Sequence, residues 1–133
     1  MRVLALDYGS ARCGCALSDP TGTLATPIDA IARPATRKGF ARVVDLVRER
    51  GAERVVVGLP LGLSGADTDQ TREARAWADR LAAAVAVPVE LYDERFTTAI
   101  AARSPGERTS EDSRAAAVLL EDWLTRHARE VTG

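Results

Sequence analysis

Short apolar runs alternate along the chain with longer segments in which apolar residues recur at helical spacing. Residues 2–8, RVLALDY, are almost continuously apolar, which is typical of a strand covered on both faces. A tight Gly-Ser turn separates them from a second expected strand, RCGCALS, at 12–18. A third, GTLATPIDAI at 22–31, alternates weakly and contains Pro27, which predicts a place at the edge of a sheet. The first third of the chain therefore predicts an antiparallel meander.

Further along, the apolar pattern changes to the period of a helix. In residues 37–50 apolar positions recur every three or four residues, up to a stop signal at Gly51. The other predicted elements are, in chain order, a strand at 54–60, a loop at 61–67, a helix at 69–86, a strand at 87–92, a short helix at 97–103, a loop at 104–110 and a final helix at 111–128. This order predicts an α/β fold with a mixed five-stranded sheet, in which two parallel strands extend the three-strand meander and helices cover both faces.

Composition narrows the class of protein. A chain of 133 residues is expected to form one domain over 1–133. Its 46% apolar and 28% charged residues are typical of a soluble globular protein, and no apolar run approaches the ~18 residues of a membrane span. Cys13 and Cys15 are expected as buried, reduced thiols, which fits a cytoplasmic location. The net charge of −1 gives no electrostatic argument for nucleic acid, so any basic groove must be local.

Three carboxylate positions stand out by their place in this pattern. Asp7 ends the first strand, and Asp93 and Glu94 follow the last strand, so both sites share the carboxyl edge of the sheet if these strands run parallel. Asp112 lies four residues before Ala116 on the apolar stripe of the final helix, where an acid is costly unless it is paired or binds a metal. Convergent carboxylates without Cys or His suit Mg²⁺ or Mn²⁺, and two such ions can support phosphodiester hydrolysis.

Each acid also has a purely structural interpretation. Asp7 and Asp112 could cap a turn and the last helix, respectively. Asp93 or Glu94 could start a helix, where acids suit the helix dipole. The functional interpretation depends on the three sites falling at one edge of the sheet, and spacing alone does not rank Asp93 against Glu94.

The chain has few of the residues that other catalytic mechanisms require. The one histidine, His127, is expected on the surface of the last helix, which argues against a Ser-His-Asp scheme. Glu121 and Asp122 on the same helix are interpreted as ordinary surface charges. The glycine-rich stretch GLPLGLSG lacks the Lys-Ser/Thr of a P-loop and is expected to be a strand-to-helix loop that borders the site.

Several motifs in chain order resemble those of the YqgF family. They are LALDYGSARCGCALSD, VVVGLPLGLSG, YDERFTT and EDSRAAAVLLEDWL, and together they span nearly the whole chain. The family consists of small bacterial proteins with a ribonuclease H-like fold. Its members are described as RuvX-like Holliday junction resolvases and as nucleases that mature the end of pre-16S ribosomal RNA. DYG alone is a weak signal, but the four motifs in one short chain are specific together.

The resemblance implies three catalytic, metal-binding acids, which map onto Asp7, Glu94 and Asp112. It implies a nuclease that uses two divalent ions, Mg²⁺ or Mn²⁺, with in-line attack of water at phosphorus and products that carry 5′-phosphate and 3′-hydroxyl ends. The expected partner is nucleic acid, either RNA or branched DNA, bound by a monomer or a homodimer. The expected nucleic-acid contacts are Arg12, Arg95, Arg103, Arg108 and Arg114.

The chain departs from the family pattern at two places. GLP is followed here by LGLSG, where the family usually has an Asn and then Asp-Gly. The segment between Thr98 and Asp112 is shorter than usual and lacks most of the family's Lys/Arg-rich loop. This second departure leads to the hypothesis of a weaker or altered grip on nucleic acid.

Processing of the 5′ end of pre-16S rRNA is the leading functional hypothesis, and Holliday junction resolution is the alternative. Symmetric cutting of a four-way junction needs two active sites and hence a dimer, whereas trimming one RNA end needs one. Two other classes stay open. Actin-like sugar kinases and ATPases begin with a similar Asp-x-Gly hairpin but need two such domains, and a catalytically silent nucleic-acid adaptor would fit the shortened basic segment.

Overall fold

The computed structural model describes residues 1–59, 68–93 and 111–132, with the side chains of the last helix described over 113–127. The elements are β1 (Val3–Asp7), β2 (Arg12–Ser18), β3 (Ala25–Ala32), α1 (Arg37–Glu49), β4 (Arg54–Leu59), α2 (Asp69–Ala84), β5 (Val89–Asp93) and α4 (Glu111–Thr132). The short helix predicted at 97–103 and the loops predicted at 61–67 and 104–110 lie outside the described residues.

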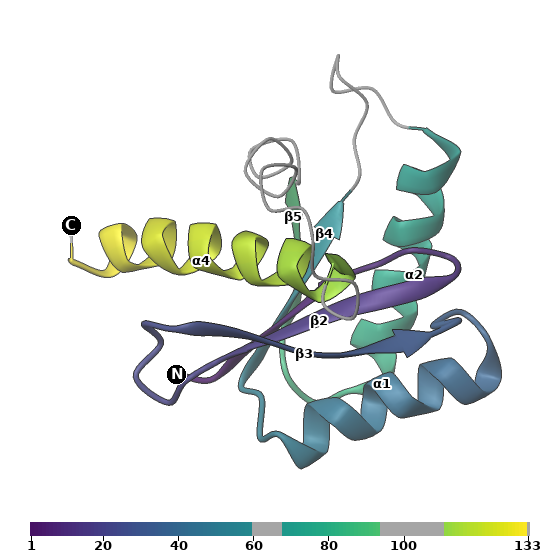
Figure 1. Ribbon diagram of the computed structural model, residues 1–133, viewed down its shortest axis with the longest axis horizontal. Helices are drawn as coiled ribbons and strands as arrows, with labels where there is room; N and C mark the ends of the chain where they lie inside the picture. The colour runs from purple at the N-terminus through teal and green to yellow at the C-terminus, as the bar shows by residue number, and fades with distance from the viewer. Residues whose placement is uncertain (60–67, 94–110, 133) are drawn as a thin grey trace.

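The strands form one five-stranded sheet in the order β3-β2-β1-β4-β5 (Figure 1). β1 and β3 both pair with β2 in antiparallel orientation, while β4 runs parallel to β1 and β5 runs parallel to β4. The predicted meander, its two-strand parallel extension and the edge position of the third strand are therefore confirmed.

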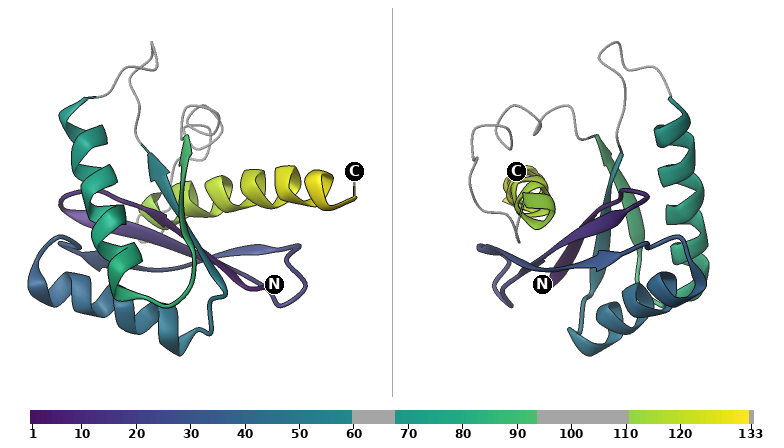
Figure 2. Two further views of the ribbon diagram at one scale, coloured as in Figure 1. Left: turned by 180° about the vertical axis from the view of Figure 1, so that it is seen from behind. Right: turned by 45° about the vertical axis from the view of Figure 1, so that its right-hand side comes forward.

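Helices cover both faces of this sheet. Figure 2 shows α4 on one side, and α1 and α2 on the other. Each side has its own apolar core, and β1 is common to both because its alternate residues point to opposite faces. The core under α4 is closed by a helical stripe of buried residues, Ala116, Ala117, Leu119, Leu120 and Trp123. In the described part of the chain, no helix is long and apolar enough to cross a membrane.

The turn before β3 is longer than the sequence pattern predicts. The Asp19 carboxylate accepts backbone N–H bonds from Thr23 at 2.8 Å and Leu24 at 3.0 Å, and Gly22 adopts a left-handed φ of 74°. These bonds stabilise a turn that competes with strand pairing, so β3 begins at Ala25 instead of residue 22. At the other end of the chain, α4 extends beyond its predicted end at residue 128.

α1 begins at a tight corner after β3. Thr36 caps the helix by accepting a hydrogen bond from the Gly39 backbone N–H at 3.1 Å. The α carbon of Gly39 lies so close to the end of β3 that an added Cβ would sit 2.0 Å from the Arg33 carbonyl oxygen. Glycine is required here because the helix and the strand end approach closely, although its φ is ordinary.

We expect Gly39→Ala to lower the free energy of unfolding by about 1–3 kcal/mol, since the added methyl group would displace the end of β3. At an unobstructed helix position the same change would stabilise the protein by about 1 kcal/mol, so the sign of the effect is diagnostic. Urea denaturation followed by circular dichroism measures it, and a raised midpoint would contradict the close contact.

Candidate catalytic carboxylate site

Asp7 is the last residue of β1, the central strand of the sheet, and its side chain is half-buried. Because β1, β4 and β5 are parallel, their carboxyl ends meet at one edge, with Asp7 on β1, Leu59 on β4 and Asp93 on β5. The prediction that Asp7 shares the carboxyl edge of the sheet with the acids at the end of the last strand is therefore confirmed for Asp93. This edge is where open α/β sheets bind ligands.

The alternation of β1 places the Asp7 side chain on the α4 side of the sheet. Val3 and Ala5 belong to the core under α4, whereas Leu4 and Leu6 belong to the core under α1 and α2. Asp7 follows Val3 and Ala5 at intervals of two residues and so shares their face. An acid at this position therefore faces the same layer as the last helix.

Glycines flank Asp7 on both neighbouring strands. Gly14 of β2 is its direct partner, and the pairing of Leu6 with Val57 places Gly58 of β4 next in register on the other side. Both glycines are buried, and neither has a side chain to cover the carboxylate from the α4 side. The two strands beside Asp7 therefore place no side chain next to its carboxylate. Glycine inside a strand is a known signal of close approach by a ligand or another backbone, and both glycines are visible in the sequence.

The start of α4 is fixed to this face of the sheet by Ser113, which is 1% exposed. Its hydroxyl accepts the Cys15 backbone N–H at 3.3 Å and donates to the Ile28 carbonyl at 2.5 Å. Cys15 and Ile28 are partners on β2 and β3 beside an irregularity in the register, so the hydroxyl bridges two backbone groups of the ladder. The helix backbone at Asp112 is thereby held on the face that Asp7 occupies.

Of the three acids that the family resemblance implies as ligands, Asp7, Glu94 and Asp112, only Asp7 has a described side chain. The Asp112 side chain and the whole of Glu94 lie outside the described residues. Within the described ranges, no three His, Cys, Asp or Glu side chains lie together as a metal site.

Asp93, the last residue of β5, lies on the opposite face of the sheet from Asp7. Tyr92 packs against the core under α4, while Leu91 packs on the other core. Asp93 follows Leu91 by two residues, so alternation turns it to the α1 and α2 side, away from the face of Asp7. Asp93 is therefore at the right edge of the sheet but on the wrong face for a shared site.

Asp122 corrects one sequence-based interpretation. It is not an ordinary surface charge, because its carboxylate accepts a hydrogen bond from the Tyr92 hydroxyl and forms an ion pair with Arg126 at 3.2 Å. The contact joins β5 to α4, two elements far apart in the sequence, which is why spacing on the helix alone did not reveal it.

The single histidine is also less exposed than predicted. His127 is half-buried and its ring stacks on Trp123 at 4.4 Å between centroids, toward the end of α4 remote from Ser113. Cys13 and Cys15 are free, fully buried thiols in the core under α1 and α2, as expected. Neither cysteine faces the Asp7 side, so oxygen donors characterise the described part of the site.

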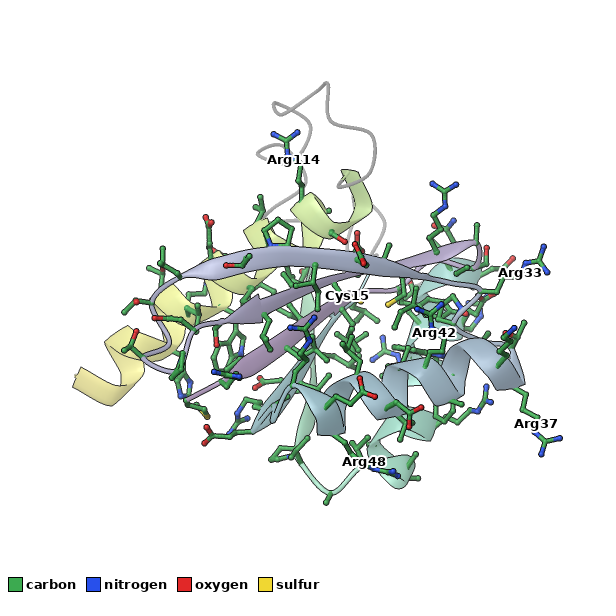
Figure 3. All side chains as sticks on the ribbon, turned by 60° about the horizontal axis from the view of Figure 1, so that its bottom comes forward. Cys15, Arg33, Arg37, Arg42, Arg48 and Arg114 are labelled. Atoms are coloured by element: carbon green, nitrogen blue, oxygen red, sulfur yellow. The ribbon has the colours of Figure 1, made fainter. Side chains whose placement is uncertain are left out.

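Two of the arginines expected to contact nucleic acid are described. Arg12 is exposed at the start of β2, at the same edge as Asp7. Arg114 is half-buried on the first turn of α4, and its buried Nη1 atom has no hydrogen-bond partner among the described residues. Figure 3 shows its side chain projecting away from the sheet. The others, Arg95, Arg103 and Arg108, lie outside the described residues.

A second polar contact borders the site on the α2 side. The Tyr8 hydroxyl donates to the Glu73 carboxylate at 2.5 Å, and the Tyr8 ring packs on Trp77 with 4.8 Å between centroids. Burial, and then the bond to Glu73, raise the pKa of Tyr8 well above its ordinary value. Burial and the bond to Asp122 raise the pKa of Tyr92 in the same way. Sequence patterns gave no signal for these pairs.

Comparison with known proteins identifies the family. The family model described as "RuvX: Holliday junction resolvase" matches residues 1–126. A protein of Mycobacteroides abscessus named "Putative pre-16S rRNA nuclease" is 41% identical over 96% of this chain and 83% of its own length. The chain belongs to the RuvX family. A relative of the same name from Anaeromyxobacter sp. (strain Fw109-5) is 41% identical, with 96% of this chain and 100% of the relative covered.

This membership confirms the resemblance of the sequence motifs to the RuvX/YqgF family. The fold has a solved counterpart in Thermus thermophilus RuvC in complex with a Holliday junction substrate, with a TM-score of 0.63 and 17% identity over 96% of both chains. A second RuvC structure from the same organism gives a TM-score of 0.61 at 16% identity. At this level of identity the likeness concerns the fold, and it confirms the predicted ribonuclease H-like class.

Tyr8 and Tyr92 are the two tyrosines of the chain, so their titration can be followed without interference. We expect no phenolate absorbance to develop near pH 10 in the folded protein, whereas the chain unfolded in urea should titrate there. Because only the unfolded state releases these protons as the pH rises past 10, the free energy of unfolding should fall in that range. One tyrosine equivalent titrating near pH 10 in the folded protein would contradict the Glu73 or the Asp122 contact.

Proposed function

We propose that this chain is a divalent-metal-dependent nuclease that hydrolyses phosphodiester bonds and processes the 5′ end of pre-16S rRNA. The observation that carries the proposal is the position of Asp7. Its carboxylate ends the central strand between Gly14 and Gly58, on the face of the sheet to which Ser113 fixes the start of α4. Family membership and the names of the relatives support nuclease activity.

The metal ligands in this proposal are Asp7, Glu94 and Asp112. The position of Asp93 on the opposite face of the sheet from Asp7 supports Glu94 as the second ligand. The donor set fits a hard cation, because the neighbours of Asp7 in the sheet are glycines and the two thiols lie on the opposite face. Mg²⁺ or Mn²⁺, bound as two ions, would activate water and stabilise the leaving oxygen.

The chain's own residues have separate tasks in this scheme. Asp7 supplies an anionic ligand from the buried central strand of the sheet. Gly14 and Gly58 place no side chain beside it, so that neither neighbouring strand obstructs a phosphodiester at the carboxylate. Ser113 positions the first turn of α4, and Arg12, exposed at the same edge, binds backbone phosphate.

Pre-16S rRNA is the preferred substrate in the proposal because relatives that are 41% identical carry that name and are matched over nearly the whole chain. Holliday junction resolution is the second candidate, and the description of the family model favours it. Cutting both strands of a junction symmetrically would need a homodimer, whereas RNA trimming can be done by a monomer. The two free thiols at Cys13 and Cys15 suit action in the reducing cytoplasm.

A cleavage assay tests the function. Labelled single-stranded RNA containing a pre-16S leader and a labelled four-way DNA junction are incubated side by side with Mn²⁺, Mg²⁺ or chelator. We expect RNA cleavage that depends on the metal and is lost by at least a hundredfold in Asp7→Asn, with an unchanged circular dichroism spectrum. Cleavage of the junction alone would favour the second candidate, and wild-type rates in Asp7→Asn would refute the proposed site.

Ser113→Ala tests whether α4 must be held at the sheet for activity. Loss of the hydroxyl leaves the Cys15 N–H and the Ile28 carbonyl buried without their partner, at a cost of about 1–3 kcal/mol in the free energy of unfolding. We expect cleavage to fall at least tenfold as well, under conditions where the variant is fully folded.

The matched control is Ser18→Ala. Ser18 is also a buried serine whose hydroxyl accepts a strand N–H, from Val3 at 2.7 Å, and donates to a carbonyl, of Met1 at 3.2 Å, but at the opposite edge of the sheet. Its loss should cost similar stability and leave cleavage unchanged. Equal activity of the two variants would show that Ser113 serves stability alone.

A further inference from the structure

Four cations gather at the corner between β3 and α1, remote in sequence from the arginines expected to bind nucleic acid. Arg33, Arg37, Lys38 and Arg42 are all exposed, and all except Arg37 line one hollow beside the start of α1. Figure 3 shows Arg33, Arg37 and Arg42 toward one end of α1, with Arg48 toward the other end. We refer to Arg33, Arg37, Lys38 and Arg42 as the basic corner.

Arg42 also lines a second hollow together with Asp29 and Asp45, but the charges of the basic corner are not held in ion pairs. None of its four side chains forms an ion pair or hydrogen bond with another described residue, and the first turn of α1 contains no acid. Cations near a helix N-terminus are unfavourable because they add to the positive end of the dipole. The chain as a whole has a net charge of −1, so this local excess of positive charge is a feature of the corner.

The rest of α1 does not share this excess. Toward its end, Asp45 and Glu49 are interspersed with Arg48 and Arg50, all of them exposed. That half of the helix is therefore close to neutral. The basic corner is therefore a local cluster of positive charge, which the general abundance of arginine in the chain does not explain.

Hydrogen bonds from three other parts of the structure hold the backbone that carries Arg33 at the start of the basic corner. Arg33 has a φ of 46°, in the left-handed region that residues with a side chain rarely adopt, and its N–H donates to the Ala11 carbonyl at 2.9 Å. Its own carbonyl accepts the Thr36 hydroxyl at 2.7 Å. From α2, the Trp77 indole N–H donates to the Pro34 carbonyl at 3.0 Å. The four cations thus project from a braced surface.

The basic corner lies on the α1 side of the sheet, near the edge at which Asp7 ends β1, whereas the Asp7 side chain faces α4. Ala11, which accepts the Arg33 N–H, belongs to the turn that directly follows Asp7. Ala32 pairs with Arg12 on β2, and Asp7 pairs with Gly14 on the same strand. From a strand spacing of about 4.8 Å and a rise of about 3.3 Å per residue, the Cα atoms of Ala32 and Asp7 are roughly 12 Å apart. A polynucleotide bound at Asp7 would reach the corner within a few nucleotides.

We propose that the basic corner binds the phosphate backbone of the nucleic-acid substrate where the strand leaves the carboxylate site on the β3 side. Arginine suits this role because its guanidinium group binds phosphate in a bidentate manner. The inference rests on the proposed function and adds a contact region outside the segment between Thr98 and Asp112. It offsets the shortness of that basic segment, so weak binding does not follow from the departure in sequence.

The test compares two double variants that each remove two positive charges from α1 and its C-cap. Arg37→Gln/Arg42→Gln removes charge from the basic corner, and Arg48→Gln/Arg50→Gln is the matched control. Binding of a fluorescein-labelled 20-nucleotide single-stranded RNA and of a labelled four-way DNA junction is measured by anisotropy over a series of salt concentrations, with chelator present to prevent cleavage. Circular dichroism verifies that each variant is folded.

For single-stranded RNA, each lost phosphate contact lowers the slope of log K against log salt concentration by about 0.7, which corresponds to about fivefold weaker binding at 0.1 M salt. We therefore expect the corner variant to bind at least tenfold more weakly, with a slope smaller by about 1.4, while the control stays within twofold of wild type. If the corner variant weakens binding of only one of the two nucleic acids, that nucleic acid is the one that the basic corner contacts.

Equal affinities and equal slopes of the two double variants on both substrates would overturn the inference, as would the absence of measurable binding by folded wild-type protein. The proposed function fails separately. If binding depends on the corner but the wild-type protein cleaves neither substrate with Mn²⁺, the nuclease assignment is wrong and the binding surface stands. If the wild-type protein cleaves and both double variants bind alike, the nuclease assignment stands and the corner is not a binding surface.

Discussion

The pleat of the buried β1 strand is the constraint on which the rest of the site depends. Leu4 and Leu6 must enter one core while Val3 and Ala5 enter the other, and both cores are closed by helices. A shift of one residue would exchange the two sets and turn Asp7 toward α1 and α2. Hydrophobic packing over the length of the strand therefore determines the face on which its terminal carboxylate lies.

A polar contact complements this apolar constraint. The Ser113 hydroxyl bridges the backbones of β2 and β3 and so fixes where α4 begins on the sheet. Packing of the apolar stripe of α4 alone would tolerate sliding along the sheet, because the stripe repeats with each turn. A directional hydrogen bond in a buried place removes that freedom, since leaving the two backbone groups unpaired is costly. The site thus combines a strand fixed by burial with a helix fixed by hydrogen bonding.

The sequence predicts much of the fold because its apolar periods are clear. The strands at Val3–Asp7 and Arg54–Leu59 and the helices at Arg37–Glu49 and Asp69–Ala84 lie close to their predicted bounds. Apolar periodicity does not predict structure that local polar hydrogen bonds or long-range contacts determine. Examples are the Asp19 turn and the contact of Asp122 with Tyr92. The edge of the sheet could be predicted for the acids. That Gly14 and Gly58 are the neighbours of Asp7 follows only from the strand register, although both glycines are visible in the sequence.

The central claim is that Asp7 holds a divalent cation on the α4 side of the sheet, together with Glu94 and Asp112. A crystal structure of the protein with Mn²⁺ and a short RNA, read by the anomalous signal of manganese, tests it most directly. The account predicts manganese beside the Asp7 carboxylate on the side of Val3 and Ala5, with two ions when RNA is present. Manganese bound only elsewhere, or on the side of Leu6 and Tyr8, would contradict it.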